Sequence, residues 1–309
     1  MKAIVCTKYG PPEVLQLKDV EKPTPRNNEV CIKIFATAVT ASDCIIRGFK
    51  VPVKFWLPMG VVMGFTKPRK PILGMVSAGE VESAGKDVTR FEKGNQVYTF
   101  NIKRFGTYAE YICLPEDEVI ALKPSNLTYE EAAAVPYGGM LALHFLKKGN
   151  IQSGQKILIY GASGAIGTSA VQLARTIGAQ VTGVCSTTNL ELVKSLGADT
   201  VIDYTTEDFA NRRELYDFIF DAVGKRKSAN FQGKNALTSN GKYISVDDGS
   251  PKLHVEDLIF LKELAEAGKI KPVIDRCYPL EQMVEAHRYV DQGHKKGNVV
   301  ITVEHNNNT

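Results

Sequence analysis

The chain has 309 residues and a formal net charge of +4, with 44% hydrophobic and 23% charged residues. This length allows two domains with full cores, and the composition is ordinary for a globular protein. The basic residues are spread out without interleaved aromatic residues, which argues against a nucleic-acid partner. The longest uncharged apolar run, 55–65, is too short to span a bilayer.

The six cysteines, at positions 6, 31, 44, 113, 185 and 277, stand far apart and form no CxxC pair. We therefore expect reduced, buried thiols and neither a structural zinc site nor a redox dithiol. The first ten residues, MKAIVCTKYG, predict a strand and not a signal peptide. Together these features indicate a cytoplasmic protein.

Residues 1–122 predict a domain of short strands separated by turns rich in Gly, Pro and Asn, which suggests an open β-barrel. Residues 51–70 between two of these strands are apolar and hold the only tryptophan, Trp56. This loop could accept a flat apolar substrate, pack on another subunit or touch a membrane, and the sequence does not choose among the three. The expected strands are Ala3–Thr7, Leu15–Val20, Val30–Ala38, Gly74–Glu82, Gln96–Phe100 and Tyr108–Leu114.

Two helices, Tyr129–Val135 and Gly138–Lys147, lead to the segment KILIYGASGAIG at 156–167. It predicts a strand, a glycine turn and a helix, Ala165–Ile177, whose N-terminus would form an anion site. Glycine turns after strands are common, so this pattern alone is a weak signal for a dinucleotide, and alanine replaces its usual first glycine. The expected pyrophosphate contacts are Ala162, Ser163, Gly164, Ala165, Ile166 and Gly167.

Strands and helices alternate after this turn, which predicts a doubly wound parallel sheet with α/β architecture. Ala222, Val223, Ser245 and Val246 would lie at the carboxyl edge of that sheet, where ligands bind. The expected strands are Gln180–Cys185, Thr200–Asp203, Tyr216–Asp221 and Lys242–Val246, and the expected helices are Asn189–Leu196, Thr206–Arg213 and Arg226–Leu237.

The C-terminal part predicts a helix, Leu280–Val290, and a strand, Asn298–Val303, that returns to the first domain. The polar tail HNNNT is expected to be disordered. We therefore expect a first domain of residues 1–123 completed by 275–309, and a dinucleotide-binding domain of residues 124–274.

This order of elements resembles the medium-chain dehydrogenase/reductase superfamily, and within it the zinc-free quinone oxidoreductase, zeta-crystallin-like branch. The resemblance implies a GroES-like barrel domain and a Rossmann domain. The matching segments cover nearly the whole chain. They are Lys2-Ala3, Val39–Asp43, Pro71–Gly74, Gly106–Tyr111, Ala132–Pro136, Gly161–Gly167 and Leu196–Asp199.

Zinc relatives need three protein ligands at an open site. The positions that match theirs hold Thr40, Met75 and Val76, which are poor or impossible zinc ligands, and the five histidines show no ligand spacing. We expect no metal, and we expect the histidines to be surface or capping residues.

NAD enzymes usually carry an acid at the end of the second strand. Here that end offers the hydroxyls of Ser186 and Thr187 without a carboxylate, and Tyr204 matches a family position near the 2′-phosphate of NADPH. We therefore expect NADPH rather than NADH, although Ser186 and Thr187 could merely cap the next helix. Asn298 completes the expected cofactor contacts.

The resemblance implies hydride transfer from NADPH to a quinone or to the activated C=C of an α,β-unsaturated carbonyl. Thr40 would lie near the nicotinamide ribose or the substrate oxygen, or bond only locally, and Asp43 would cap the short helix Cys44–Arg47. Tyr98 and Tyr137 are candidate proton donors, with core packing as the alternative for both. Other possibilities are an NADPH-binding protein with little turnover and an alcohol dehydrogenase-like carbonyl reductase. A homodimer is expected, because Lys242–Val246 would be an exposed sheet edge.

Overall fold

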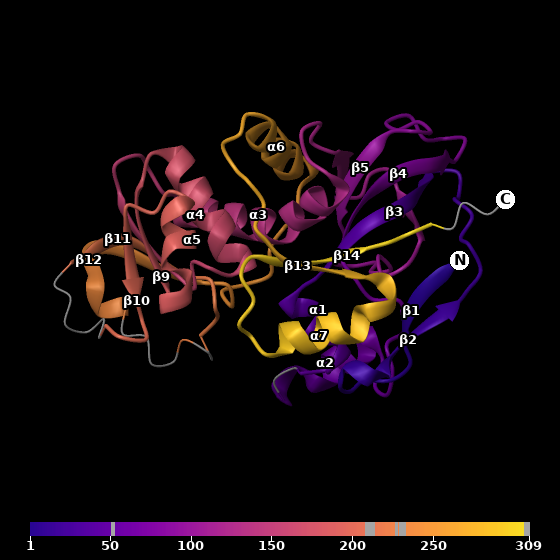
Figure 1. The fold of residues 1–309 in the computed structure, drawn as a ribbon, viewed down its shortest axis with the longest axis horizontal. Helices are drawn as coiled ribbons and strands as arrows, with labels where there is room; N and C mark the ends of the chain where they lie inside the picture. Colours follow the sequence, from indigo (N-terminus) through magenta and orange to yellow (C-terminus); the bar gives the residue numbers. More distant parts are fainter. Residues whose placement is uncertain (51–52, 208–213, 226–227, 229–232, 306–309) are drawn as a thin grey trace. The chain divides into compact units, whose positions relative to one another are not determined.

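The computed structural model in Figure 1 describes residues 1–50, 53–207, 214–225, 228 and 233–305, with the backbone alone at 53–55 and 233–234. The chain divides into two compact units: unit 1 is Met1–Pro136 with Ile274–Thr309, and unit 2 is Tyr137–Val273. The helix α3 (Tyr129–Gly149) passes from one unit to the other.

Unit 1 is built on a seven-stranded sheet around β3, whose apolar side chains are buried except for half-buried Phe35. The strand order is β13-β14-β3-β4-β5-β7, and β6 also pairs with β3. A separate hairpin joins β1 and β2. The strands are β1 (Lys2–Cys6), β2 (Leu15–Asp19), β3 (Glu29–Val39), β4 (Val76–Ala84), β5 (Gln96–Phe100), β6 (Tyr111–Pro115), β7 (Ile120–Leu122), β13 (Ile274–Pro279) and β14 (Asn298–Thr302).

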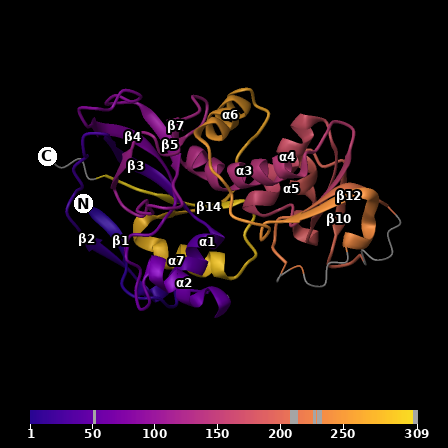
Figure 2. The same cartoon turned by 180° about the vertical axis from the view of Figure 1, so that it is seen from behind.

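Besides the start of α3, the described residues of unit 1 form three α-helices: α1 (Ala41–Arg47), α2 (Val53–Met63) and α7 (Met283–Asp291). Helices α1 and α7 lie side by side in both views (Figures 1 and 2). Helix α7 buries Met283, Ala286 and Val290 in the same core as Ile32 and Ile34 of β3. Positions three and four apart share one face of a helix, so this spacing fixes which side of α7 packs inward.

Unit 2 is a five-stranded, entirely parallel sheet in the order β10-β9-β8-β11-β12. This order places the first strand, β8, in the middle, which is the doubly wound arrangement that the sequence predicts. The elements are β8 (Lys156–Tyr160), α4 (Ala165–Ile177), β9 (Gln180–Cys185), α5 (Leu190–Ser195), β10 (Thr200–Asp203), β11 (Tyr216–Asp221), β12 (Leu237–Ser245) and α6 (Val255–Glu266).

Several expected elements differ from the structure. The two helices expected before and after Pro136 are one continuous helix, α3. Ala132, Ala133 and Ala134 are buried, and their packing outweighs the one hydrogen bond that proline removes. Strand β12 begins at Leu237, which we had expected to end a helix. Strands β7 and β13 and helices α2 and α6 were not predicted. Most of the helix expected at Thr206–Arg213, much of that at Arg226–Leu237, and the tail 306–309 lie outside the described residues.

Candidate functional site

The glycine turn joins β8 to α4 in a tight, well-bonded loop. The amides of Gly161 and Ala162 both donate to the carbonyl of Val184, at 3.0 and 2.9 Å, which ties the turn to the end of β9. Gly161 has φ +78°, a conformation that favours glycine. Gly164 is the N-cap of α4 and offers no side-chain acceptor, so the first amides of this helix receive no cap from the protein. This is the geometry of an anion site.

Two glycines of the turn have different steric roles. A Cβ at Gly167 would lie only 2.1 Å from the carbonyl oxygen of Gly161, so this glycine permits the close packing of α4 on the turn. A Cβ at Gly164 would touch only that same oxygen, at 3.6 Å, which is ordinary contact. The protein's own packing therefore does not require glycine at 164. Glycine would be required there if the backbone had to approach a bound pyrophosphate closely.

The ends of β11 and β12 lie at the carboxyl edge of the unit 2 sheet, as does the glycine turn after β8. The amide of Ala222 donates to the carbonyl of Tyr160 at 3.0 Å, and the amide of Val246 donates to that of Asp221 at 2.9 Å. Buried Asp221 shapes this turn by accepting from the amides of Val223 and Gly224, each at 3.0 Å. We did not predict this role for Asp221. An aspartate that ends a strand before a glycine turn is the available signal.

The end of β9 lies beside a carboxylate, contrary to the sequence expectation. Thr187 Oγ1 donates to Asp203 Oδ2 at 2.5 Å, and Thr205 Oγ1 donates to Asp203 Oδ1 at 2.6 Å. These hydrogen bonds, that from Thr187 first, lower the pKa of Asp203 to about 2. Asp203 is level with Cys185 in the parallel register of β10 on β9. The expectation of hydroxyls without a carboxylate is therefore wrong, and the proton of Thr187 is already engaged.

Ser186 has a different environment. Buried Asn189 donates through Nδ2 to Ser186 Oγ at 3.1 Å and to Ser163 Oγ at 3.2 Å. Asn189 thus connects the glycine turn to the end of β9, while its Oδ1 has no hydrogen-bond partner among the described residues. Ser186 Oγ accepts from Asn189 and makes no side-chain cap bond, but it also lies 3.5 Å from Thr188 Oγ1, a long contact in which either hydroxyl could donate. Its proton could turn from Thr188 to a ligand. Tyr204 is 54% exposed, with its ring 6.2 Å from that of Tyr160.

The remaining predicted residues belong to unit 1. Thr40, not Asp43, is the N-cap of α1, and the two form a capping box. Thr40 Oγ1 donates to Asp43 Oδ2 at 2.6 Å, and burial raises the pKa of Asp43 to about 6. Tyr98 in β5 is completely buried, which matches its core-packing alternative. Asn298 is buried at the start of β14.

The residues at the zinc-ligand positions offer little to a metal. Met75 and Val76 are buried, and the carbonyl of Val76 accepts from Thr37 Oγ1 at 2.6 Å. Within the described ranges, no group of three or more His, Cys, Asp or Glu side chains could hold a metal ion. The same part of the chain contains no helix long and apolar enough to cross a membrane.

Comparisons with known proteins identify both units. Residues 26–124 match the alcohol dehydrogenase GroES-like domain, and residues 165–272 match the zinc-binding dehydrogenase family. The chain is 34% identical to 2-methylene-furan-3-one reductase of Solanum lycopersicum, over 97% of this chain and 79% of that protein. It is 30% identical to the chloroplastic NADPH-dependent alkenal/one oxidoreductase of Arabidopsis thaliana, with the same coverage.

Among solved structures, the quinone oxidoreductase of Coxiella burnetii superposes with a TM-score of 0.87 at 29% identity. The match covers 98% of this chain and 99% of that one. The expected fold class, a Rossmann sheet with a GroES-like domain, is confirmed. The chain belongs to the medium-chain dehydrogenase/reductase superfamily, in the branch of its quinone oxidoreductases.

Proposed function

We propose that this protein transfers hydride from NADPH, without zinc, to a quinone or to the activated C=C of an α,β-unsaturated carbonyl. The main observation is that the N-terminus of α4 has no side-chain cap and begins at Gly164, a glycine that packing within the protein does not require. The names of the relatives, a furanone reductase and an alkenal/one oxidoreductase, support the class of acceptor.

The cofactor contacts follow from the edge of the unit 2 sheet. The pyrophosphate would lie on the amides of Ser163–Gly167. The turn of Ala222 and Val223 and the end of β12 at Ser245 and Val246 would face the nicotinamide half. Ser186 and Tyr204 would contact the 2′-phosphate, with Ser186 as the donor.

The bound cofactor would supply the hydride, and this chain's residues would orient the acceptor and exclude water. A proton from solvent would complete the reduction of the C=C bond. Because Thr40 donates its proton to Asp43, it would accept a hydrogen bond from the nicotinamide ribose rather than act as an acid. Asn298 is proposed as a further contact, and burial disfavours Tyr98 as the proton donor.

The test follows oxidation of NADPH and of NADH with a quinone, an enone and a simple aldehyde. We expect turnover of the quinone or the enone, faster with NADPH, and no effect of a chelator. Turnover of the aldehyde alone would favour a carbonyl reductase, and stoichiometric zinc with loss of activity on chelation would contradict a zinc-free enzyme. Tight NADPH binding without turnover of any acceptor would favour a binding protein.

The assembly and location of the protein are also proposals. Strand β12 lies at an edge of its sheet, and such edges are usually covered, so we propose a homodimer. Sedimentation that shows a monomer at micromolar concentration would contradict it. All six cysteines are unpaired, which supports a reducing, cytoplasmic location.

A further inference from the structure

Helix α2 and the turn after it expose an unusual amount of apolar surface. Leu57, Val61 and Val62 of this helix are 64%, 54% and 71% exposed, and Trp56 and Phe65 are 47% and 44% exposed. The helix carries no acidic residue. We call these five side chains, with the cations described below, the α2 face. Apolar side chains gathered in this way mark an interaction site.

The end of α2 contacts half-buried Tyr9. Tyr9 Oη donates to the carbonyls of Met63 and Gly64, at 3.0 and 3.1 Å, and so anchors the end of the helix. The ring of Phe65 packs against Gly60, so closely that a Cβ added at Gly60 would lie 2.3 Å from it. The same ring contacts the ring of Trp56. The C-terminal end of α2 is therefore bound to the segment that holds Tyr9.

Positive charge adjoins this apolar surface. From Cys44 to Gly79 the sequence contains no acidic residue, and three of its six basic residues, Lys67, Arg69 and Lys70, follow shortly after α2. Lys67 and Arg69, with Lys18 and Phe65, line an open pocket of about 740 Å³ next to the end of α2. None of these three cations forms an ion pair with any other described residue.

We propose that the α2 face docks on an anionic lipid surface. The 11 residues of α2 are too few to span a bilayer, but a helix lying flat can place its apolar side chains at the boundary of the acyl chains. Lys18, Lys67 and Arg69 would then meet the lipid phosphates. A second copy of this chain fits less well, because a twofold contact would bring two clusters of unpaired cations together.

Trp56 makes a direct test possible, because it is the only tryptophan in the chain and belongs to the α2 face. The protein is mixed with vesicles of phosphatidylcholine, alone or with phosphatidylserine. Flotation measures binding, and the tryptophan emission reports the environment of the face. We expect binding and a blue shift with the anionic vesicles only, and weaker binding at high salt.

Matched variants separate the apolar from the electrostatic contribution. Leu57→Ser with Val62→Ser, and Lys67→Ala with Arg69→Ala, should each weaken partitioning about tenfold. The controls are Leu122→Ser, which changes an exposed leucine of β7, and Lys86→Ala with Lys93→Ala, which removes two exposed lysines elsewhere in unit 1. They should bind like the unchanged protein.

Three results would overturn the proposal. One is the absence of a blue shift with anionic vesicles. Another is an equal loss of binding in the control variants, which would indicate non-specific charge attraction. The third is a lipid-free dimer that Leu57→Ser with Val62→Ser converts to a monomer, which would assign the α2 face to a second copy.

Discussion

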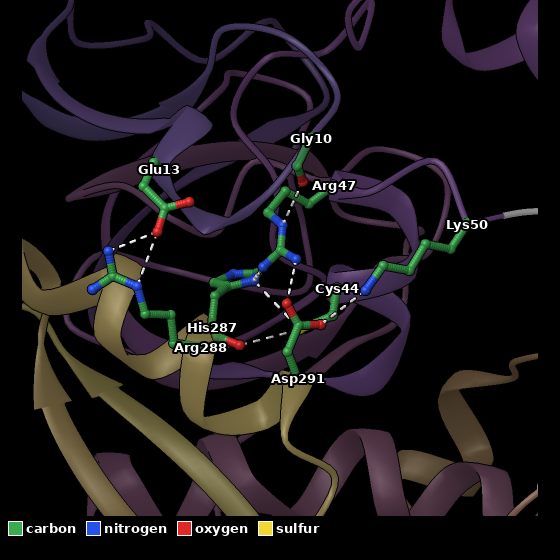
Figure 3. A network of polar contacts seen from close by, with 8 residues as sticks. All are labelled: Gly10, Glu13, Cys44, Arg47, Lys50, His287, Arg288 and Asp291. Atoms are coloured by element: carbon green, nitrogen blue, oxygen red, sulfur yellow. Dashed lines mark hydrogen bonds and ion pairs between the residues drawn. The ribbon is translucent and has the colours of Figure 1, made fainter.

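Each unit contains a polar cluster, and the two clusters are built differently. In unit 1 the guanidinium of Arg47, which is 1% exposed, donates to the carbonyl of Gly10 at 3.2 Å, to His287 Nδ1 at 3.0 Å and to Asp291 Oδ2 at 2.5 Å (Figure 3). These contacts join α1, α7 and the turn at Gly10. Burial first, and then the charge of Arg47, lower the pKa of His287 to about 3, so this histidine is neutral.

In unit 2 the cluster at the carboxyl edge of the sheet stays open. Asp203 and Asp221 are satisfied by hydroxyls and backbone amides, but Asn189 keeps an unpartnered Oδ1 among the described residues, and Tyr204 is exposed. The Arg47 cluster also leaves one buried atom, His287 Nε2, without a partner among the described residues, but its other contacts join α1 to α7. We therefore expect substitutions in the Arg47 cluster to change mainly stability, and substitutions at the Asp203 edge to change mainly cofactor binding.

The largest effect is expected at Arg47. Arg47→Ala leaves His287 and Asp291 without their buried donor, and loss of one partner of a buried ion pair costs about 3–5 kcal/mol of unfolding free energy. Lys50→Ala is the matched control, because Lys50 contacts the same Asp291 at 3.3 Å from an exposed position, where a pair contributes less than about 1 kcal/mol. Urea unfolding measures both. Similar losses in the two variants would show that burial does not set the strength of this network.

Asp43 and Asp203 should change the unfolding free energy with pH in opposite directions. The pKa of buried Asp43 is raised from 3.8 to about 6, so the folded state binds its proton more tightly than the unfolded state. Its contribution to stability is full below pH 3.8 and falls as the pH rises to about 6, by roughly 3 kcal/mol. Asp203, with its pKa lowered to about 2, contributes stability above pH 3.8 that is lost as the pH falls through 2.

We therefore expect Asp43→Asn to remove a decline in unfolding free energy between pH 3.8 and about 6. Its amide oxygen can still accept from Thr40. Asp203→Asn should leave that window unchanged, which makes it the control. Urea unfolding at several pH values provides the measurement. An unchanged decline in Asp43→Asn would mean that another group causes it.

Substitution of the two glycines of the turn should affect different properties, stability at Gly167 and cofactor binding at Gly164. Gly167→Ala places a Cβ 2.1 Å from a backbone oxygen and should destabilise the fold by about 1–3 kcal/mol. Gly164→Ala meets no such contact and should lower the unfolding free energy by less than about 1 kcal/mol, the cost of alanine at an N-cap. The larger Gly164→Val should leave a folded protein but abolish NADPH binding. Thermal unfolding and calorimetry measure the two properties. Full NADPH affinity in Gly164→Val would place the pyrophosphate elsewhere.

The sequence predicted the strand–turn–helix of unit 2 because its signals are local. Apolar periodicity, a run of small residues and a C-terminal glycine all fall within 22 residues, 157–178. Helix α2 was missed because Pro58 and Gly60 interrupt its pattern. Helix α3 was divided at Pro136 because burial, which outweighs the proline, is not visible in sequence.

The site was predicted less completely, because its missing parts depend on distant pairings. Asp203 reaches Thr187 only through the register of β10 on β9. His287, which we expected at the surface or as a cap, is fully buried, and its partner Arg47 lies 240 positions away in the chain. No local pattern contains either pairing.

The smallest expected effect concerns the choice of cofactor at the Asp203 edge. Ser186→Asp removes a hydroxyl donor and adds a second charge near the expected 2′-phosphate, so it should reduce the preference for NADPH over NADH about tenfold, which is about 1.4 kcal/mol. Asp203→Asn removes the existing charge and should increase that preference by a smaller factor. Asp199→Asn is the control, because it removes a charge at the opposite end of β10. Calorimetric affinities for both cofactors decide the outcome. If Ser186→Asp leaves their ratio unchanged, the phosphate does not contact this edge, and the hydroxyls of Ser186 and Thr187 serve the protein alone.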